Sequence, residues 1–185
     1  MTKLESPSYE GFSFTLYSYI ITNMTIRLAT LDDLDNIRSC FTIAKSKMVN
    51  DGNLEQWKDI DYPFCYTKED IEKGQCYVVI NDDNELVATF VFIIGEDPTY
   101  SYIEGSWLSN NKYGTIHRIA SNNKEKHIFR TVLDYVLTYD VDIRIDTHKD
   151  NKRMKHLIEK NGFTYCGIIY VRDGTPRLAY QLERK

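Results

Sequence analysis

The segment from Ile143 to Phe163 changes from a strand pattern to a helix pattern at a place where a ligand could bind. Apolar and polar residues alternate over Ile143–Thr147, and a helical repeat follows, with Asp150 or Asn151 as the N-cap and Gly162 as the stop. A strand that passes directly into a helix leaves backbone N–H groups free at the end of a sheet, where they can hold an anionic or polar ligand. Taken alone, the segment fits an ordinary strand–helix unit with good caps better than a binding site.

Four titratable side chains lie on or beside strand-like segments and could move a proton. His117 is the best placed, because it lies in the strand-like segment 113–121 and a histidine titrates near neutral pH. Glu104, which precedes that segment, could serve instead, and Asp146 and His148 are weaker candidates. A position at the surface or at the edge of the core explains each of these residues at least as well as a catalytic role.

The overall composition indicates what class of protein this is and argues against some others. The 185 residues are 42% hydrophobic and 27% charged, which predicts one folded domain with a single core. A net charge of −4 argues against a protein that binds nucleic acid through phosphate contacts. The four cysteines are widely spaced and show no metal-ligand pattern, so we expect free thiols, no metal and a cytoplasmic location.

Residues 1–23 differ from the rest of the chain. Their apolar run, Phe12–Ile21, is too short and too often interrupted to cross a membrane. Glu5 and Glu10 stand where a secretory signal would carry basic residues. A cleaner pattern opens at Met24, so we expect an N-terminal extension over 1–23, a functional domain over 24–185 and no membrane association.

The pattern along the domain predicts one mixed sheet with helices on both faces. Strands are expected at residues 25–30, 76–81, 86–94, 113–121, 143–148, 164–171 and 177–183, and helices at 31–49, 68–74, 128–137 and 152–161. The strand at 86–94 is apolar nearly throughout, so we expect it to be central and covered on both faces.

The order of these elements and the carboxy-terminal motifs resemble the GNAT superfamily of N-acetyltransferases. The motifs are "IHRIAS", "KEKHIFRTVLDYVL", "DTHKDNKRMKHLIEKNGF" and "YCGIIYVRDGTPRLAY", and the resemblance covers residues 24–185. It implies the acyl-CoA N-acyltransferase fold, an α/β (α+β) fold with a single, mostly antiparallel sheet. It also implies an enzyme that moves an acetyl group from acetyl-CoA to a primary amine, of a small molecule or a peptide, by direct attack in a ternary complex.

The resemblance places acetyl-CoA in a cleft where the strands at 113–121 and 143–148 splay apart. Backbone groups of Ile119, Ala120 and Ser121 would bond the pantetheine arm. The further cofactor-binding residues that the resemblance implies are Lys124, Lys126, His127, Ile128, Phe129, Arg130, Asn151 and Met154. Free N–H groups at the start of a helix and basic side chains beside it favour a phosphate at this place.

Two features depart from the superfamily pattern. His127 and Phe129 stand where the pyrophosphate loop usually has glycines, so we expect a higher cost of binding there, and side chains that plugged the cleft would defeat the assignment. Ile158 stands where many relatives have a tyrosine that protonates the leaving thiolate. These departures leave two alternatives: a catalytically impaired acyl-CoA-binding sensor, or an interaction module that docks by strand addition through residues 12–21.

Acetyl transfer to an amine needs a neutral nitrogen, whereas an alkyl ammonium has a pKa of about 10. His117 or Glu104 could remove that proton, although juxtaposing the reactants could supply much of the rate without a base. Trp57, Tyr62 and Trp107 fall in loops that would rim the acceptor side, where rings can hold a cationic amine or simply pack. We expect an amine acceptor, no nucleic-acid partner and no membrane partner, with a homodimer left open.

Overall fold

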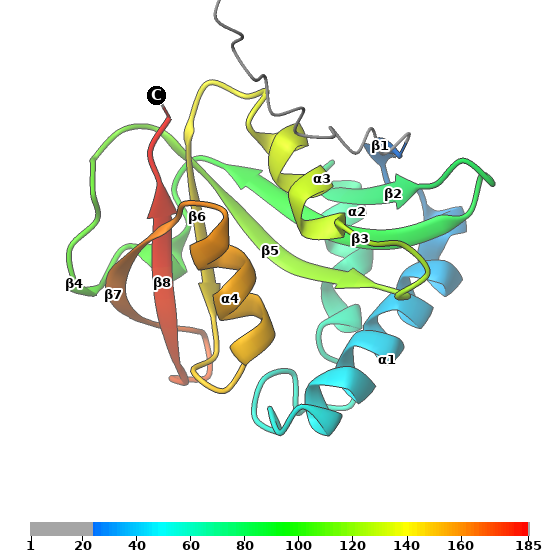
Figure 1. Ribbon diagram of the computed structural model, residues 1–185, viewed down its shortest axis with the longest axis horizontal. Coiled ribbons are helices and arrows are strands. Elements are labelled where there is room, and N and C mark those ends of the chain that lie inside the picture. Colours follow the sequence, from blue (N-terminus) through cyan, green and yellow to red (C-terminus); the bar gives the residue numbers. More distant parts are fainter. Residues whose placement is uncertain (1–23, 185) are drawn as a thin grey trace, which may run out of the picture.

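The computed structural model describes residues 24–184, which form one eight-stranded sheet (Figure 1). The strand order is β1-β2-β3-β5-β6-β8-β7-β4, and within this part of the chain only the β5–β6 pair is parallel. The strands are β1 (Thr25–Leu28), β2 (Cys76–Ile80), β3 (Leu86–Ile94), β4 (Glu104–Gly105), β5 (Tyr113–Ser121), β6 (Asp142–Thr147), β7 (Thr164–Tyr170) and β8 (Pro176–Leu182). The helices are α1 (Leu34–Asn50), α2 (Thr67–Glu72), α3 (Ile128–Val136) and α4 (Lys152–Lys160), with short 3-10 turns η1 (Leu31–Asp33), η2 (Phe64–Tyr66) and η3 (Pro98–Tyr100). The expected mixed, mostly antiparallel sheet is confirmed.

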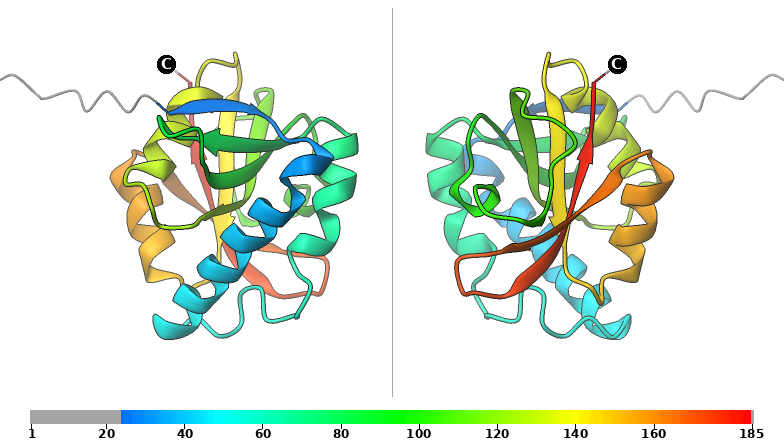
Figure 2. Two further views of the ribbon diagram at one scale, coloured as in Figure 1. Left: turned by 90° about the vertical axis from the view of Figure 1, so that its right-hand side faces the viewer. Right: turned by 90° about the vertical axis from the view of Figure 1, so that its left-hand side faces the viewer.

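Helices cover both faces of the sheet, α1 and α2 on one and α3 and α4 on the other (Figure 2). Ile37 of α1 packs in the same cluster as Val91 of β3, whereas Val132 of α3 and Ile158 of α4 pack in the cluster that holds Phe90. Phe90 and Val91 are neighbours in β3, and successive side chains of a strand point to opposite faces. The apolar run of β3 therefore serves both cores, which confirms it as a central strand.

Strands β5 and β6 are paired over only part of their length. Tyr113–Ile116 of β5 lies in register with Asp142–Ile145 of β6, and beyond Ile116 the two strands have no further pairs. β5 continues along β3, with a register irregularity opposite Thr89 and Val91 and a positive φ of 51° at Arg118. A bulge of this kind bends and twists its strand. It thereby helps to turn the end of β5 away from β6.

Helix α3 begins at Ile128, as the apolar pattern predicts, and the Lys124–His127 part of the motif "KEKHIFRTVLDYVL" belongs to the loop before it. The expected extension over residues 1–23 lies outside the described residues. Between residues 24 and 184, no helix combines the length and the apolar character that a membrane span requires.

Candidate active site

An open cavity of about 750 Å³ lies where β5 and β6 separate. Residues 116–121 of β5 and Ile145 and Asp146 of β6 line it from the sheet. The end of α1, the segment from there through α2, residues 96–99, the start of α3, the start of α4 and the turn between β7 and β8 also line it. The cavity therefore collects side chains from parts of the chain that are far apart in sequence.

One half of the cavity holds most of the residues expected to bind the cofactor. These are Ile119, Ala120, Ser121, Ile128, Phe129, Asn151 and Met154. The charged members of the expected set do not line it: Lys124 pairs with Glu85 at 2.8 Å, and Arg130 pairs with Asp134 at 2.6 Å. Lys126 and His127 are exposed and also lie outside the lining.

Other basic residues, which are not among those expected to bind the cofactor, line the same half. They are Lys47 near the end of α1, and Lys152 and Arg153 in the first turn of α4. Lys47 Nζ donates to Asn123 Oδ1 at 2.6 Å, and Arg153 pairs with Asp51 at 3.3 Å. Positive charge is thus present beside the cavity, but it comes from α1 and α4 rather than from the loop before α3.

The loop before α3 adopts the backbone shape that glycines usually supply. Asn123 and His127 have φ values of 62° and 64°, in the left-handed region that glycine favours. The His127 side chain points to solvent, and the Phe129 ring is buried in the core 6.4 Å from the Phe163 ring. These bulky residues do not plug the cavity, because Phe129 only contributes to its wall.

The start of α4 is fixed by the side chain of Asn151. Its Oδ1 accepts a hydrogen bond from the Met154 backbone N–H at 3.0 Å, which makes it the N-cap, one of the two candidates that the sequence offers. Its Nδ2 donates to Gln56 Oε1 at 2.9 Å and ties α4 to the segment after α1. Ile158, at the position of the family tyrosine, is fully buried in the core.

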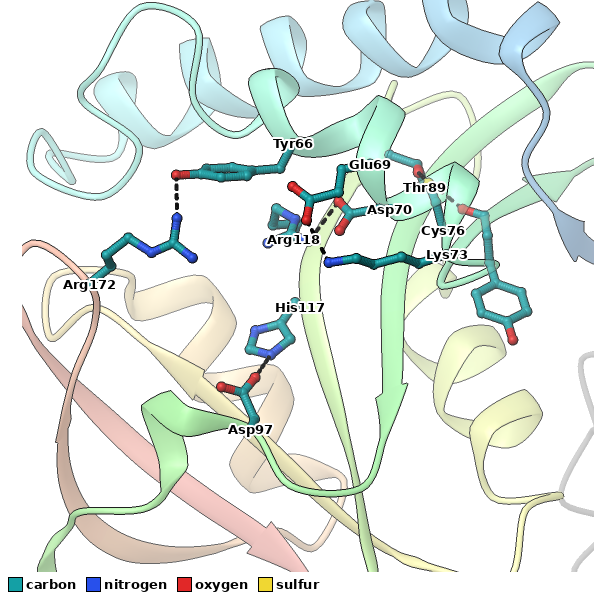
Figure 3. Close-up of polar contacts among 11 residues, drawn as sticks. Tyr66, Glu69, Asp70, Lys73, Cys76, Thr89, Asp97, His117, Arg118 and Arg172 are labelled. Carbon is teal, nitrogen blue, oxygen red and sulfur yellow. Dashed lines mark hydrogen bonds and ion pairs between the residues drawn. The ribbon is translucent and has the colours of Figure 1, made fainter.

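His117 and Asp97 form a hydrogen-bonded pair on the other half of the cavity (Figure 3). His117 Nε2 lies 2.7 Å from Asp97 Oδ2, and the second carboxylate oxygen accepts the Thr99 backbone N–H at 2.9 Å. Burial raises the pKa of Asp97, but the hydrogen bonds from His117 and Thr99 outweigh it, so its pKa lies below the usual value. The carboxylate is therefore ionised at neutral pH and can only accept from the ring.

A second buried pair, Arg118 with Asp70 of α2, lies next to the first along β5 (Figure 3). Arg118 Nη2 lies 2.6 Å from Asp70 Oδ2, and both side chains are largely buried. Burial raises the pKa of Asp70, and the Arg118 charge only partly offsets this. The pair joins α2 to the bulge of β5 and sets one wall of the cavity.

The remaining candidates divide between the cavity and its surroundings. Trp57 and Tyr62 line the cavity. Glu104 does not: it is exposed on β4 and accepts a hydrogen bond from the Tyr170 hydroxyl at 2.8 Å. Trp107 also lies outside, stacked on the Tyr100 ring at 5.5 Å.

The two weaker base candidates on β6 and after it also differ in position. Asp146 lines the cavity, where its Oδ1 accepts the Tyr100 hydroxyl at 2.6 Å. His148 is buried and lies outside the lining, and its Nδ1 accepts the Asp150 backbone N–H at 3.3 Å. Burial lowers the pKa of His148, as does the nearby Arg177 charge. Among the four candidates, only His117 and Asp146 face the cavity.

Solved structures with the same fold include an acetyltransferase of the GNAT family from Streptococcus agalactiae. It is 35% identical to this chain, with a TM-score of 0.78, and the match covers 88% of this chain and 96% of that one. GNAT-family acetyltransferases from Listeria monocytogenes and Bacillus cereus, each 18% identical, share the fold with TM-scores of 0.65 and 0.56. Those matches cover 87% and 88% of this chain and 95% and 98% of the other chains. No protein-family profile and no curated protein matches the chain.

Proposed function

The chain belongs to the GNAT family of acetyltransferases, and we propose that it moves an acetyl group from acetyl-CoA to a primary amine by direct attack in a ternary complex. One observation carries this proposal: the open cavity between β5 and β6 has a histidine–carboxylate pair, His117 with Asp97, on its wall. A long thiol carrier and an amine can meet there beside a group that is able to take a proton.

The cofactor half of the cavity has the chemistry that acetyl-CoA requires. When bound, acetyl-CoA supplies the acetyl group as a thioester. Ile119–Ser121 lies where β6 no longer pairs with β5, so backbone groups on that side are available to an amide-containing arm. Lys47, Lys152 and Arg153 supply positive charge for phosphate groups.

The His117–Asp97 pair sets which ring nitrogen can act as the base. Because the ionised Asp97 carboxylate can only accept, Nε2 of His117 carries the hydrogen and Nδ1 keeps its lone pair. Nδ1 takes the proton of the attacking nitrogen, directly or through one water, as the N–C bond forms and the C–S bond breaks. Such general-base help typically accelerates a reaction by about 10²- to 10⁴-fold.

The proposal is tested by adding acetyl-CoA to the full chain and measuring thermal unfolding and thiol release. Acetyl-CoA at about 100 times its dissociation constant should stabilise the fold by about 2.7 kcal/mol, which corresponds to about 5–10 °C. A panel of primary amines should then release free CoA thiol together with the N-acetylated product. Stabilisation without transfer to any amine would favour an acyl-CoA-binding sensor, and no shift at millimolar acetyl-CoA would refute cofactor binding.

A further inference from the structure

Three arginines line the end of the cavity that the cofactor half does not occupy. They are Arg118 of β5, Arg172 in the turn between β7 and β8, and Arg177 of β8. Arg172 Nη1 donates to the Tyr66 hydroxyl at 3.2 Å, and the guanidinium carbons of Arg172 and Arg118 lie 5.5 Å and 5.8 Å from the Tyr66 ring centroid. Figure 3 shows Arg172 at the hydroxyl end of that ring and Arg118 towards its other end. Three separate elements thus bring guanidinium groups to one end of the cavity.

These guanidinium groups have few close carboxylate partners. Arg118 pairs with Asp70, but its Nε is buried and has no hydrogen-bond partner among residues 24–184. Arg177 is almost fully buried, and its Nε lies 4.0 Å from Asp146 Oδ2, which is beyond hydrogen-bonding distance. Arg172 forms no ion pair within the same described range. Within residues 24–184, the three guanidinium groups therefore form one ion pair at hydrogen-bonding distance, Arg118 with Asp70.

The exposed acids at the rim form no ion pair with these arginines among residues 24–184. Glu69 pairs with Lys73 at 2.5 Å, and Asp173 Oδ1 accepts the Thr175 backbone N–H at 2.9 Å. Guanidinium N–H groups at this end of the cavity therefore remain available to a ligand. Guanidinium groups recognise planar carboxylates especially well, because two parallel N–H donors match the two oxygens.

The neighbouring wall of the cavity carries acidic rather than basic side chains. Glu96, which is exposed, and Asp97 line the cavity beside His117, where an incoming ammonium group would be favoured before it loses its proton. His117 and Arg118 are consecutive in β5 and both line the cavity, so the acidic and basic walls are neighbours. A ligand that satisfies both walls carries an amine and a carboxylate close together.

We propose that the acceptor is an α-amino acid, with its amino group at His117 and its carboxylate at Arg172, supported by Arg118 and Arg177. This assignment rests on the proposed acetyl transfer and specifies the substrate class of the same site. Tyr66 orients the Arg172 guanidinium, and Tyr62 adds an aromatic wall against which an apolar side chain can pack.

The test compares amines that differ only in the carboxylate: L-phenylalanine with phenethylamine, L-leucine with isopentylamine and L-alanine with ethylamine. Each is assayed for thiol release from acetyl-CoA and for the N-acetylated product. The amino acid of each pair should have a kcat/KM at least about tenfold higher, as expected for a charge-assisted hydrogen bond. Equal or better turnover of the simple amines would overturn the amino-acid assignment alone, and no turnover of any amine would overturn the acetyl transfer on which it rests.

The variant Arg172→Gln locates the carboxylate site. It should raise KM for L-phenylalanine about tenfold and lower the ratio of kcat/KM for L-phenylalanine to that for phenethylamine by a similar factor relative to the wild type. Arg184→Gln is the matched control, because it removes an equal charge from an exposed arginine that pairs with Asp140 outside the cavity. A KM for L-phenylalanine that is the same in R172Q, R184Q and the wild type would show that Arg172 does not bind the carboxylate.

Discussion

Nε2 of His117 lies 2.7 Å from Oδ2 of Asp97, although the two residues are 20 positions apart in the chain. Asp97 is held in place independently, because its other oxygen caps η3 through the Thr99 N–H. The edge-to-face contact of His117 with Tyr100, at 5.8 Å between ring centroids, restricts the imidazole from a further side. The ring is therefore positioned before any substrate arrives, with its second nitrogen left for proton transfer.

Replacing His117 with alanine should remove the base. We expect kcat to fall by about 10²- to 10⁴-fold, with an unchanged thermal shift on addition of acetyl-CoA. His156→Ala is the control, because His156 is exposed on α4 and does not line the cavity. If H117A and H156A both keep wild-type turnover, juxtaposition of the reactants supplies the rate and His117 is not the base.

Asp97→Asn tests the positioning role of the carboxylate. An amide can donate as well as accept, so it no longer fixes the hydrogen of His117 on Nε2. We expect kcat to fall about tenfold or more and its pH profile to change, whereas KM for acetyl-CoA should not change. Asp97→Glu should restore part of the activity because it keeps an ionised acceptor. If the pH profile of kcat for D97N superimposes on the wild-type profile, Asp97 only caps η3 and does not position His117.

The fold could be predicted from local patterns because each element shows its own period. The nearly continuous apolar run of β3 indicated a strand between two cores, and Asp150 and Asn151 were recognisable as N-cap candidates from their place before a helical repeat. The start of α3 at Ile128 also follows the apolar period, but the left-handed backbone at His127 just before it could not be predicted. Such a conformation is expected at glycine, and histidine gave no signal for it.

The candidate site was less predictable, because its partners meet only through tertiary structure. His117 could be proposed from its residue type and strand position, but Asp97 fitted a solvated turn equally well. The sequence Asp97-Pro98-Thr99 does signal a cap with proline in the first turn, yet it does not indicate which ring that carboxylate meets. Likewise, Lys47 and Arg153 reach the cofactor half from helices that lie about a hundred residues apart in sequence.

The pair of Arg27 and Asp33 should make stability depend on pH in the acid range. Arg27 donates to both carboxylate oxygens at 2.7 and 2.8 Å, and this lowers the pKa of Asp33 from its usual 3.8. A carboxyl group with a lowered pKa in the folded state contributes stability above its unfolded value and loses it as pH falls through the folded value. We expect Asp33→Asn to cost about 1 kcal/mol at pH 7.

Urea unfolding of the wild type and D33N at pH 7, 5 and 3 checks this expectation. The difference between the two proteins should be the same at pH 7 and 5 and smaller at pH 3. Asp32→Asn, which changes an exposed carboxylate one position away, should shift stability by less than about 0.5 kcal/mol. A D33N difference that grows towards pH 3 would contradict the assigned ion pair.

Gly167 of the β4–β7 contact should not tolerate a side chain. It has a φ of 147°, and a Cβ atom there would collide with the Glu104 carbonyl oxygen and with the Gly105 backbone. Gly174, in the turn before β8, also has a positive φ, but a Cβ atom there would meet open space. Gly167→Ala should therefore lower the free energy of unfolding by at least about 2 kcal/mol more than Gly174→Ala. Equal losses in chemical denaturation would mean that backbone strain, rather than collision, decides both.

Ile158→Tyr should not restore the proton donor found in many relatives. Ile158 is fully buried in the core between α4 and the sheet, so a tyrosine there adds volume and buries a hydroxyl. Overpacking alone costs about 1–3 kcal/mol, and an unsatisfied hydroxyl adds to that loss.

Leu157→Tyr is the matched comparison, because Leu157 is half-buried and lines the cavity, where a hydroxyl can reach water. We therefore expect I158Y to unfold at a lower temperature than L157Y and to show no gain in kcat, as measured by thermal unfolding and thiol release. A stable I158Y with raised kcat would show that this position faces the leaving sulfur after all, and that the core can open to admit a tyrosine.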